Sequence, residues 1–508
     1  MTLPRHADTI VVGGGTSGAV VAGLLAEHSD ETVLVLEAGP DYGSLDGGGW
    51  PGDLKDASAL GVSCDAGYDS EQTYSDRLVR FERAKVVGGC SSHNGCAAIW
   101  GSRVDYDGWA GRGLDGWATD GLRPLFHEAN RRMRVRYYQP EEITPYQQAC
   151  LDAAREAGVP IVADLNDLDE DEGMAASPVN IWDGIRWNTA FAYLDPVRSK
   201  PNLTVIGNAP VARVVVEGGR AVAVEAVVDG RIERVEAGRV VVSGGTYESP
   251  AILLRSGIGD SGDLAVAGVR TVHELPGVGR NLHDHSSVSL SFSGTPELER
   301  RMAEFGAHRW RPEEQTIAKL RSPLIPADEP GFDLHVYPVG GPDPDDSARW
   351  RWTFPLACMT PKSRGTVRLR SADPSARPLI DHRYATDDEG HDKAVLLAGA
   401  AIARDIASRE PLRTLIGEEI APGPLVAGDA DIEAWIASSC EHYYHPVGTC
   451  AMGVAGDPLA VTDARGKIHG LDGLYVADCS IMPVVPRANT NIPAVVVGER
   501  IGRWLLEA

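Results

Sequence analysis

The stretch that decides the fold lies close to the N-terminus and reads Asp8-Thr9-Ile10-Val11-Val12-Gly13-Gly14-Gly15-Thr16-Ser17-Gly18. Its apolar first five residues predict a strand, and the Ala/Leu-rich residues 19–27 predict a helix. In this G-x-G-x-x-G turn, Gly13 permits the tight turn, Gly15 lets the backbone approach a pyrophosphate, and Gly18 lets the helix pack on the strand. The N-terminus of the helix would offer free N–H groups and the positive end of its dipole to the phosphates.

A second strand and an acidic residue follow at the spacing that this turn requires. Residues 32–36 are an apolar, β-branched run that ends in Glu37-Ala38-Gly39, with Glu37 lying 19 residues after Gly18. An acid at this point accepts hydrogen bonds from an adenosine ribose and repels a 2′-phosphate. The combination of strand, glycine turn, helix, strand and acid predicts a dinucleotide-binding domain, whereas the glycine motif alone would be weak evidence.

The composition restricts the class of protein. The chain has 508 residues, which is too long for one core and predicts two or three domains. The net charge of −24 argues against nucleic acid or an anionic membrane as partner, and no apolar run approaches the length of a membrane span. The leader, residues 1–6, has no signal-peptide pattern, and the eight cysteines form no C-x-x-C pair. We therefore expect a cytoplasmic protein with reduced thiols, and we predict no metal site.

Three later segments add to this plan. Residues 211–217, 221–228 and 231–236 alternate between glycine turns and predict an antiparallel meander. A strand at 239–243 then runs into Gly244-Gly245-Thr246 and a helix at 249–255, which should rejoin the nucleotide-binding sheet beside the first strand. Strands at 287–292, 332–339, 351–358 and 365–370, with a helix at 392–408, predict a second domain built on an antiparallel sheet.

The C-terminal part again has the strand, acidic residue and helix that are typical of the nucleotide-binding domain. A strand at 474–477 ends in Asp478, as expected for an acid that faces the ribityl or phosphate region of a cofactor. A helix from about Pro493 to Leu506 would direct its N-terminus at the ring system of this cofactor.

Taken together, these blocks resemble the glucose–methanol–choline (GMC) flavin oxidoreductases along essentially the whole chain. The matching blocks are the N-terminal glycine motif, residues 87–92, 244–259, 275–285 and the two C-terminal blocks at 442–450 and 473–494. The resemblance implies a mixed α/β fold, with an FAD-binding Rossmann-like domain and a second, antiparallel-sheet substrate domain. It implies FAD, not NAD. The FAD domain would comprise residues 1–150, 206–285 and 435–508, and the substrate domain residues 151–205 and 286–434.

Within the family, the chain is most similar to the bacterial branch that resembles choline oxidase. Cys90-Ser91-Ser92-His93-Asn94 matches the segment whose histidine is bonded to the flavin in that branch, so His93 is the candidate for a covalent link, with a non-covalent contact as the alternative. A covalent bond retains the cofactor and generally raises its reduction potential. The resemblance carries the cofactor-binding role to Gly13, Gly15, Thr16, Ser17, Gly18, Glu37, Ala38, Val87, Gly89, Cys90, His93, Asn94, Gly95, Val211, Gly245, Asp478, Asn491 and Ile492.

The same resemblance names the catalytic residues. His445 is the candidate base or alkoxide stabiliser, since histidine titrates near neutrality. Asn489 would bind the substrate oxygen, and Tyr444 would face the substrate cavity. The chain differs from the branch at two positions. The branch has serine at the position of Gly95 and a small aliphatic residue at the position of Tyr443. No acid can be placed in the stretch that carries a cation-binding carboxylate there, although Glu313 and Glu314 lie just before it. This change and Gly95 both argue against recognition of a quaternary ammonium group.

The expected activity is oxidation of a small to medium alcohol to a carbonyl, by proton abstraction and hydride transfer to flavin N5. The acceptor is O2, giving hydrogen peroxide, or another carrier. A hydroxynitrile-lyase-like lyase, a decarboxylase and a non-catalytic FAD-binding protein are the alternatives. The expected partners are a small alcohol and the electron acceptor, with neither nucleic acid nor membrane, and a homodimer is left open.

Overall fold

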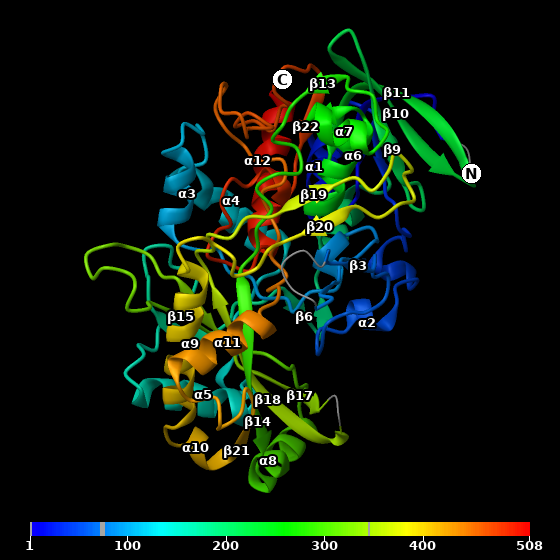
Figure 1. The fold of residues 1–508 in the computed structure, drawn as a ribbon. Helices are drawn as coiled ribbons and strands as arrows, with labels where there is room; N and C mark the ends of the chain where they lie inside the picture. The colour runs from blue at the N-terminus through cyan, green and yellow to red at the C-terminus, as the bar shows by residue number, and fades with distance from the viewer. Residues whose placement is uncertain (1–2, 72–76, 344–345, 508) are drawn as a thin grey trace.

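The computed structural model describes residues 3–71, 77–343 and 346–507. Two lobes are visible, and both ends of the chain lie in the upper one (Figure 1). Each lobe has its own hydrophobic core. A smaller apolar cluster includes Ile99 and Ala488 together with Ile317 and Tyr337, and therefore joins the two lobes.

The upper lobe is built on one mixed sheet with the strand order β8-β2-β1-β11-β10-β9, in which β22 pairs with β11. Its parallel part contains β8, β2, β1, β11 and β22, and its antiparallel part is the predicted meander. The strands are β1 (His6–Val12), β2 (Val33–Leu36), β8 (Leu203–Ile206), β9 (Val211–Glu217), β10 (Arg220–Val228), β11 (Arg231–Val242) and β22 (Leu474–Val476).

Strand β11 connects the two parts of this sheet. The sequence predicted two strands, 231–236 and 239–243, but the structure has one continuous strand. Its first half is antiparallel to β10, and its second half is parallel to β1, as expected for a return beside the first strand. A Cβ on Gly238 would lie 2.6 Å from the Asp8 carbonyl oxygen, so glycine lets β1 approach rather than ending the strand.

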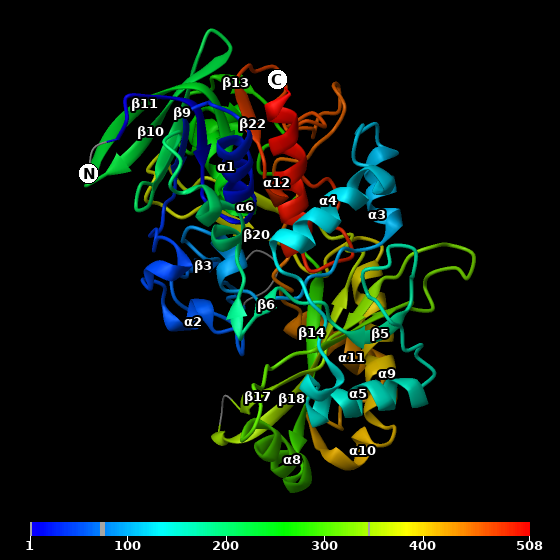
Figure 2. The same ribbon diagram turned by 180° about the vertical axis from the view of Figure 1, so that it is seen from behind.

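Two helices pack closely on one side of this sheet, α1 (Thr16–His28) and α12 (Asn491–Leu506), as Figure 2 shows. Small residues permit the approach, because a Cβ on Gly498 would lie 2.8 Å from the Ser17 carbonyl oxygen. The Ser17 hydroxyl donates to the Ala494 carbonyl at 2.7 Å. Both helices begin before the predicted residue, by three positions for α1 and two for α12.

Helix α6 (Gly245–Arg255) begins four residues before the predicted Ser249. The reason lies far along the chain, because the Asp478 carboxylate accepts the Gly245 N–H at 2.9 Å and the Ser249 hydroxyl at 2.5 Å. Local sequence alone does not contain this cap.

The lower lobe contains a seven-stranded sheet with the order β21-β14-β18-β16-β15-β5, in which β17 also pairs with β18. All its pairings are antiparallel, as predicted for the second domain. The expected strand 332–339 is divided into β16 and β17 around Pro338, which has no N–H to donate. The strands are β5 (Gly173–Ala176), β14 (Ser286–Gly294), β15 (Thr316–Leu320), β16 (Leu334–Val336), β17 (Val339–Asp343), β18 (Asp346–Cys358) and β21 (Ile416–Ala421).

The helix predicted at 392–408 is α9 (His391–Ala407), which packs on β18 and buries Val395, Leu396 and Ala400. The other helices are α2 (Gly52–Lys55), α3 (Arg103–Ala110), α4 (Thr119–Arg132), α5 (Pro145–Glu156), α7 (Ser261–Val266), α8 (Pro296–Gly306), α10 (Leu412–Leu415) and α11 (Asp429–Ser439). No helix within the described ranges combines the length and the apolar character needed to cross a bilayer.

Short strand pairs complete the fold. They are β3 (Tyr68–Asp69) with β4 (Arg80–Phe81), β6 (Ile181–Trp182) with β7 (Ile185–Arg186), β12 (Ile258–Gly259) with β13 (His273–Glu274), and β19 (Thr366–Arg368) with β20 (Leu379–Asp381). The strand predicted at 365–370 is therefore β19, which pairs with β20 and not with the main sheet of the lower lobe.

Candidate active site

One cavity of about 970 Å³ runs from the glycine turn after β1 to His445. Its walls come from both lobes, because Gly13 and Asp478 line one part, and Glu314 and Tyr337 line another. Most of the predicted cofactor residues line it, as do His445, Asn489 and Tyr444. Gly18, Val87 and Ile492 do not.

The glycine turn has the geometry that its motif predicted. A Cβ on Gly18 would overlap the Gly13 carbonyl oxygen, so Gly18 lets α1 pack against the turn. Gly15 faces Gly89, and a Cβ on Gly89 would lie 2.7 Å from the Gly15 Cα. Helix α1 begins here without a side-chain cap, so its first N–H groups are available to a ligand.

Glu37 lies at the end of β2 and is buried in the cavity wall. Its carboxylate accepts the backbone N–H groups of Gly14 at 2.9 Å and Gly39 at 2.8 Å. Burial raises the pKa of this carboxyl, while the two N–H groups oppose the rise. Ala38 and Val211 line the cavity beside it.

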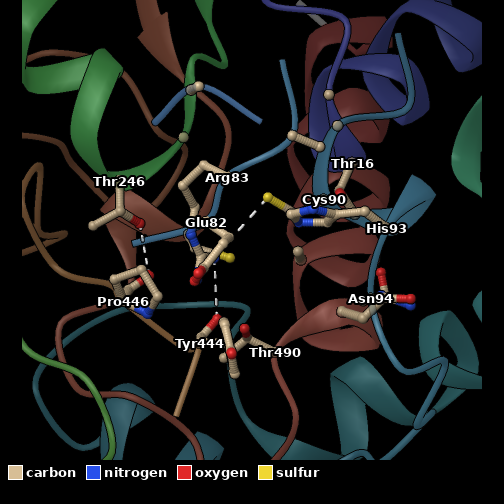
Figure 3. Close-up of a pocket in the computed structure, with 18 of the residues that line it drawn as sticks. Thr16, Glu82, Arg83, Cys90, His93, Asn94, Thr246, Tyr444, Pro446 and Thr490 are labelled. Carbon is tan, nitrogen blue, oxygen red and sulfur yellow. Dashed lines mark hydrogen bonds between the residues drawn. The ribbon is translucent and has the colours of Figure 1, made fainter. Parts of the chain in front are cut away.

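The segment from Gly88 to Gly95 forms the floor beside the glycine turn. A short 3₁₀ helix, Gly89–Ser92, brings Cys90 and His93 to the cavity, and both lie beside each other in Figure 3. Burial favours the neutral Cys90 thiol, but Arg83 and His93 outweigh it and lower its pKa to about 6. One guanidinium nitrogen of Arg83 lies 4.0 Å from the Cys90 sulfur.

The loop that carries His445 is held from three sides. The Asp284 carboxylate accepts the His445 N–H at 2.9 Å. Thr246 donates to the Pro446 carbonyl at 2.7 Å, and Arg83 donates to the Tyr444 carbonyl at 3.1 Å (Figure 3). These contacts hold Tyr444 at a φ of 67°, which non-glycine residues rarely adopt. Strain of this kind persists only where the surroundings impose it, and it is common at active sites.

The His445 imidazole is neutral in this setting. Burial, then the neighbouring His285 and His335, hold its pKa well below the usual value. Its Nδ1 lies 2.9 Å from Nδ1 of His285, so one of these two nitrogens carries the hydrogen. The other ring nitrogen of His445, Nε2, is therefore available to a molecule in the cavity.

Two asparagines at the start of α12 have unused acceptors. Among the described residues, Oδ1 of Asn489 and Oδ1 of Asn491 have no hydrogen-bond partner, although both residues line the cavity. Buried acceptors of this kind normally have partners, so their state indicates a ligand. Helix α12, like α1, begins at the cavity without a side-chain cap.

Sequence reasoning did not place Glu314. It lies in the cavity wall, where its carboxylate takes the space that a side chain on Gly95 would need and contacts Tyr337. Burial raises the pKa of Glu314 to about 7. Sequence reasoning also gave no role to His285 and Arg83. The one signal in the sequence that pointed to Glu314 was the glycine at position 95, where the branch has serine. The structure explains that glycine, because the Glu314 carboxylate from the other lobe fills the space beside it.

Within the part of the chain that the structure describes, two groups of residues bring potential metal ligands within 4.8 Å of one another. In the first, Asp284 already accepts from the His445 N–H and the Tyr384 hydroxyl, and the histidines face each other. In the second, Asp392 accepts the N–H groups of Lys362 and Ser363. These existing bonds give no reason to assign a metal. The groups are Asp284, His285 and His445, and Cys358, His391 and Asp392.

The cavity fits FAD on its own features. The uncapped start of α1 supplies N–H groups for phosphates, and the close glycine contact at Gly15 and Gly89 leaves a flat wall. The uncapped start of α12, with its unpaired amide oxygens, offers polar groups to the ring system. Arg83 supplies a positive charge beside the Cys90 sulfur and the Tyr444 carbonyl.

Comparisons with known proteins agree with this description. Two family models described as GMC oxidoreductase match residues 7–287 and 361–498. Mitochondrial choline dehydrogenase of Mus musculus is 33% identical over 97% of this chain and 88% of its own length. Choline oxidase of Arthrobacter globiformis is 32% identical over 98% of this chain and 93% of its own. Pyridoxine 4-oxidase from Mesorbium loti has a similar structure, with a TM-score of 0.86 at 26% identity over 99% of this chain and all of that chain.

Proposed function

Because the chain belongs to the GMC oxidoreductase family, an FAD-dependent enzyme family, we propose that it oxidises the CH–OH group of an alcohol to a carbonyl. The observation that carries the proposal is His445, a buried neutral imidazole whose Nε2 is directed at the cavity by the Nδ1 contact with His285. Bound FAD would supply the hydride acceptor.

The residues of the chain would handle the proton. His445 accepts the hydroxyl proton at Nε2, since its depressed pKa keeps it unprotonated at neutral pH. The side chain of Asn489 donates to the substrate oxygen and orients it. Asp284 holds the backbone of His445, so the imidazole is positioned before the substrate arrives.

We propose further that the alcohol carries a positive charge. Glu314 is a carboxylate in the wall of the same cavity, and Tyr337 contacts it. Tyr443 has its ring centre 6.5 Å from that of Tyr337 and 5.0 Å from that of His445, so aromatic rings connect the carboxylate to the base. Carboxylates and aromatic faces are the groups that bind ammonium ions. Choline dehydrogenase and choline oxidase, the relatives named above, have names that fit this class of substrate.

The covalent role of His93 is also a proposal. Its imidazole lies in the cavity beside the Cys90 thiol, which the neighbouring positive charges favour as a thiolate. A thiolate at this point would accept a proton from the imidazole and make it a better nucleophile. The electron acceptor is proposed to be O2, with another carrier as the alternative.

Anaerobic titration of the purified flavoprotein with a panel of alcohols tests the proposal. We expect choline to bleach the yellow absorbance, and its uncharged isostere 3,3-dimethyl-1-butanol to do so only at much higher concentration. Return of the colour on admission of air, with formation of peroxide, identifies O2 as the acceptor. A panel in which no alcohol bleaches the protein contradicts the oxidase and dehydrogenase assignment and favours a lyase or decarboxylase.

A further inference from the structure

Outside the lining of the cavity lies a group of buried nitrogens with no hydrogen-bond partner among the described residues. They are Nε2 of His285, both ring nitrogens of His335, and Nζ of Lys319. All three residues are at most 1% exposed. Buried polar groups without partners cost free energy, and a buried ammonium costs most, so this group requires a functional explanation.

The three residues extend outward from His445, through one direct contact, one shared aromatic neighbour and one cross-strand pair. His285 meets His445 through the Nδ1 contact, and its unpartnered Nε2 lies at the other side of the ring, although the Pro486 carbonyl is near that ring. Tyr443 joins His285 to His335, with ring centres 6.2 Å and 6.4 Å from theirs. His335 is close enough to both His285 and Lys319 for their charges to act on its pKa.

Lys319 and His335 are direct neighbours in the sheet of the lower lobe. They are cross-strand partners on β15 and β16, so their side chains project from the same face. Both contact Phe332, since His335 stacks on its ring at 5.4 Å and the Lys319 ammonium lies 5.5 Å from the ring centre.

The far end of the series faces acidic residues. The charged groups that act on Lys319 are Asp164, Asp171, Asp167 and Asp105. Asp164 and Asp167 are exposed to solvent. Asp105 is bound to Arg487, whose charge also acts on His285. Burial lowers the pKa of Lys319 to about 8, which brings its titration close to neutral pH.

We propose that His285, His335 and Lys319 carry the proton from His445 to the exposed carboxylates of the loop 164–171. This inference rests on the proposed alcohol oxidation, in which His445 receives the hydroxyl proton. The proton that enters His445 at Nε2 leaves from Nδ1 to Nδ1 of His285, and His285 releases one from Nε2. His335 passes it to Lys319, with internal water bridging gaps that exceed a hydrogen bond. No electrons move along this route. Reduction of O2 to hydrogen peroxide consumes one proton, so with O2 as the acceptor the same series returns a proton to the cavity in the oxidative half of the cycle.

Three variants separate a proton route from a fixed positive charge. Lys319→Met removes both the charge and the titrating group. Lys319→Arg keeps the charge but does not release a proton at accessible pH. Lys200→Met is the matched control, because the Lys200 ammonium is bonded to the Ala26 and Glu27 carbonyls, away from the cavity.

The experiment measures steady-state turnover with choline, or with the most active alcohol of the panel, against pH and in H2O and D2O, together with the rate of the first anaerobic bleaching. We expect both Lys319 variants to lose about tenfold or more in turnover, with a larger solvent isotope effect on turnover, while the first bleaching keeps its rate because His445 itself holds that proton. Lys200→Met should be unchanged in both measurements. Should either Lys319 variant fail to fold, His335→Gln is measured in its place and is expected to show the same loss.

The outcomes distinguish the two proposals. A wild-type protein that no alcohol bleaches overturns the proposed function and the route with it. A wild-type protein that is bleached, with Lys319→Arg indistinguishable from it in turnover rate, pH profile and isotope effect, overturns the route alone.

Discussion

Gly95 and Glu314 occupy one space, because a Cβ on Gly95 would overlap Oε1 of Glu314 and lie 2.8 Å from its Cδ. Gly95 belongs to the upper lobe, in the loop after His93, and Glu314 precedes β15 of the lower lobe. The absence of a side chain at one position therefore admits the carboxylate at the other.

Gly95→Ser should displace the Glu314 carboxylate from the cavity wall. We expect KM for choline to rise about tenfold, with little change for the uncharged isostere, because the lost interaction is with the positive charge. Gly108→Ser is the control, since a Cβ at Gly108 meets nothing within 4 Å. Equal effects on both alcohols would contradict a charge-specific role.

Glu314 should make substrate binding depend on pH. The pKa of its carboxyl is about 7, so the group is neutral below that pH and charged above it. Affinity for a cationic alcohol is therefore expected to increase as pH rises from about 6 to about 8, by up to about tenfold. Glu314→Gln should abolish this dependence in measurements of KM against pH. A variant with the wild-type slope would assign the dependence to another group.

His445→Gln should slow anaerobic bleaching by about 10²- to 10⁴-fold, because the variant has no base to accept the hydroxyl proton. Flavin content should stay at the wild-type level. His469→Gln is the control, as the His469 ring binds the Gly453 carbonyl outside the cavity. A loss of less than about tenfold in His445→Gln would place the base elsewhere.

The proposed bond to His93 is tested by acid precipitation. We expect the yellow colour to remain with the wild-type pellet and to wash out of His93→Ala, and mass spectrometry should find the flavin on the peptide that contains residue 93. His127→Ala, at the Trp100 ring, should behave as the wild type. Colour that leaves the wild-type pellet completely shows that the cofactor is not covalently held.

Lys319 should also affect stability against pH. Its pKa is about 8 in the folded protein and about 10.5 in an unfolded chain. Between these values the unfolded state binds more protons, so this residue's contribution to the free energy of unfolding increases with pH. Relative to Lys319→Met, the wild type should gain about 3 kcal/mol from about pH 8 to about pH 10.5. Denaturation curves measured at each pH give the free energy of unfolding. The same pH dependence in the wild type and in Lys319→Met would show that Lys319 titrates normally.

Local sequence was sufficient where chemistry and spacing act over a few residues. The G-x-G-x-x-G turn, the alternation of the meander and the periodicity of α9 predicted their elements, and the family resemblance predicted from the ordered blocks is confirmed. The predicted start of α6 was wrong because a distant residue, Asp478, accepts the N–H of Gly245. The predicted strand 332–339 was wrong for a local reason, since Pro338 within it has no N–H to donate.

The sequence by itself determined the nucleotide-binding architecture and brought His445, Asn489 and His93 forward as candidates, because their motifs are contiguous. Only the tertiary structure placed Glu314 against Gly95, and only it aligned His445, His285, His335 and Lys319. The pairs Gly95–Glu314 and His285–His445 each join segments more than 100 residues apart, and the first pair joins the two lobes. Their chemistry depends on burial and on atoms in contact, which no local pattern encodes.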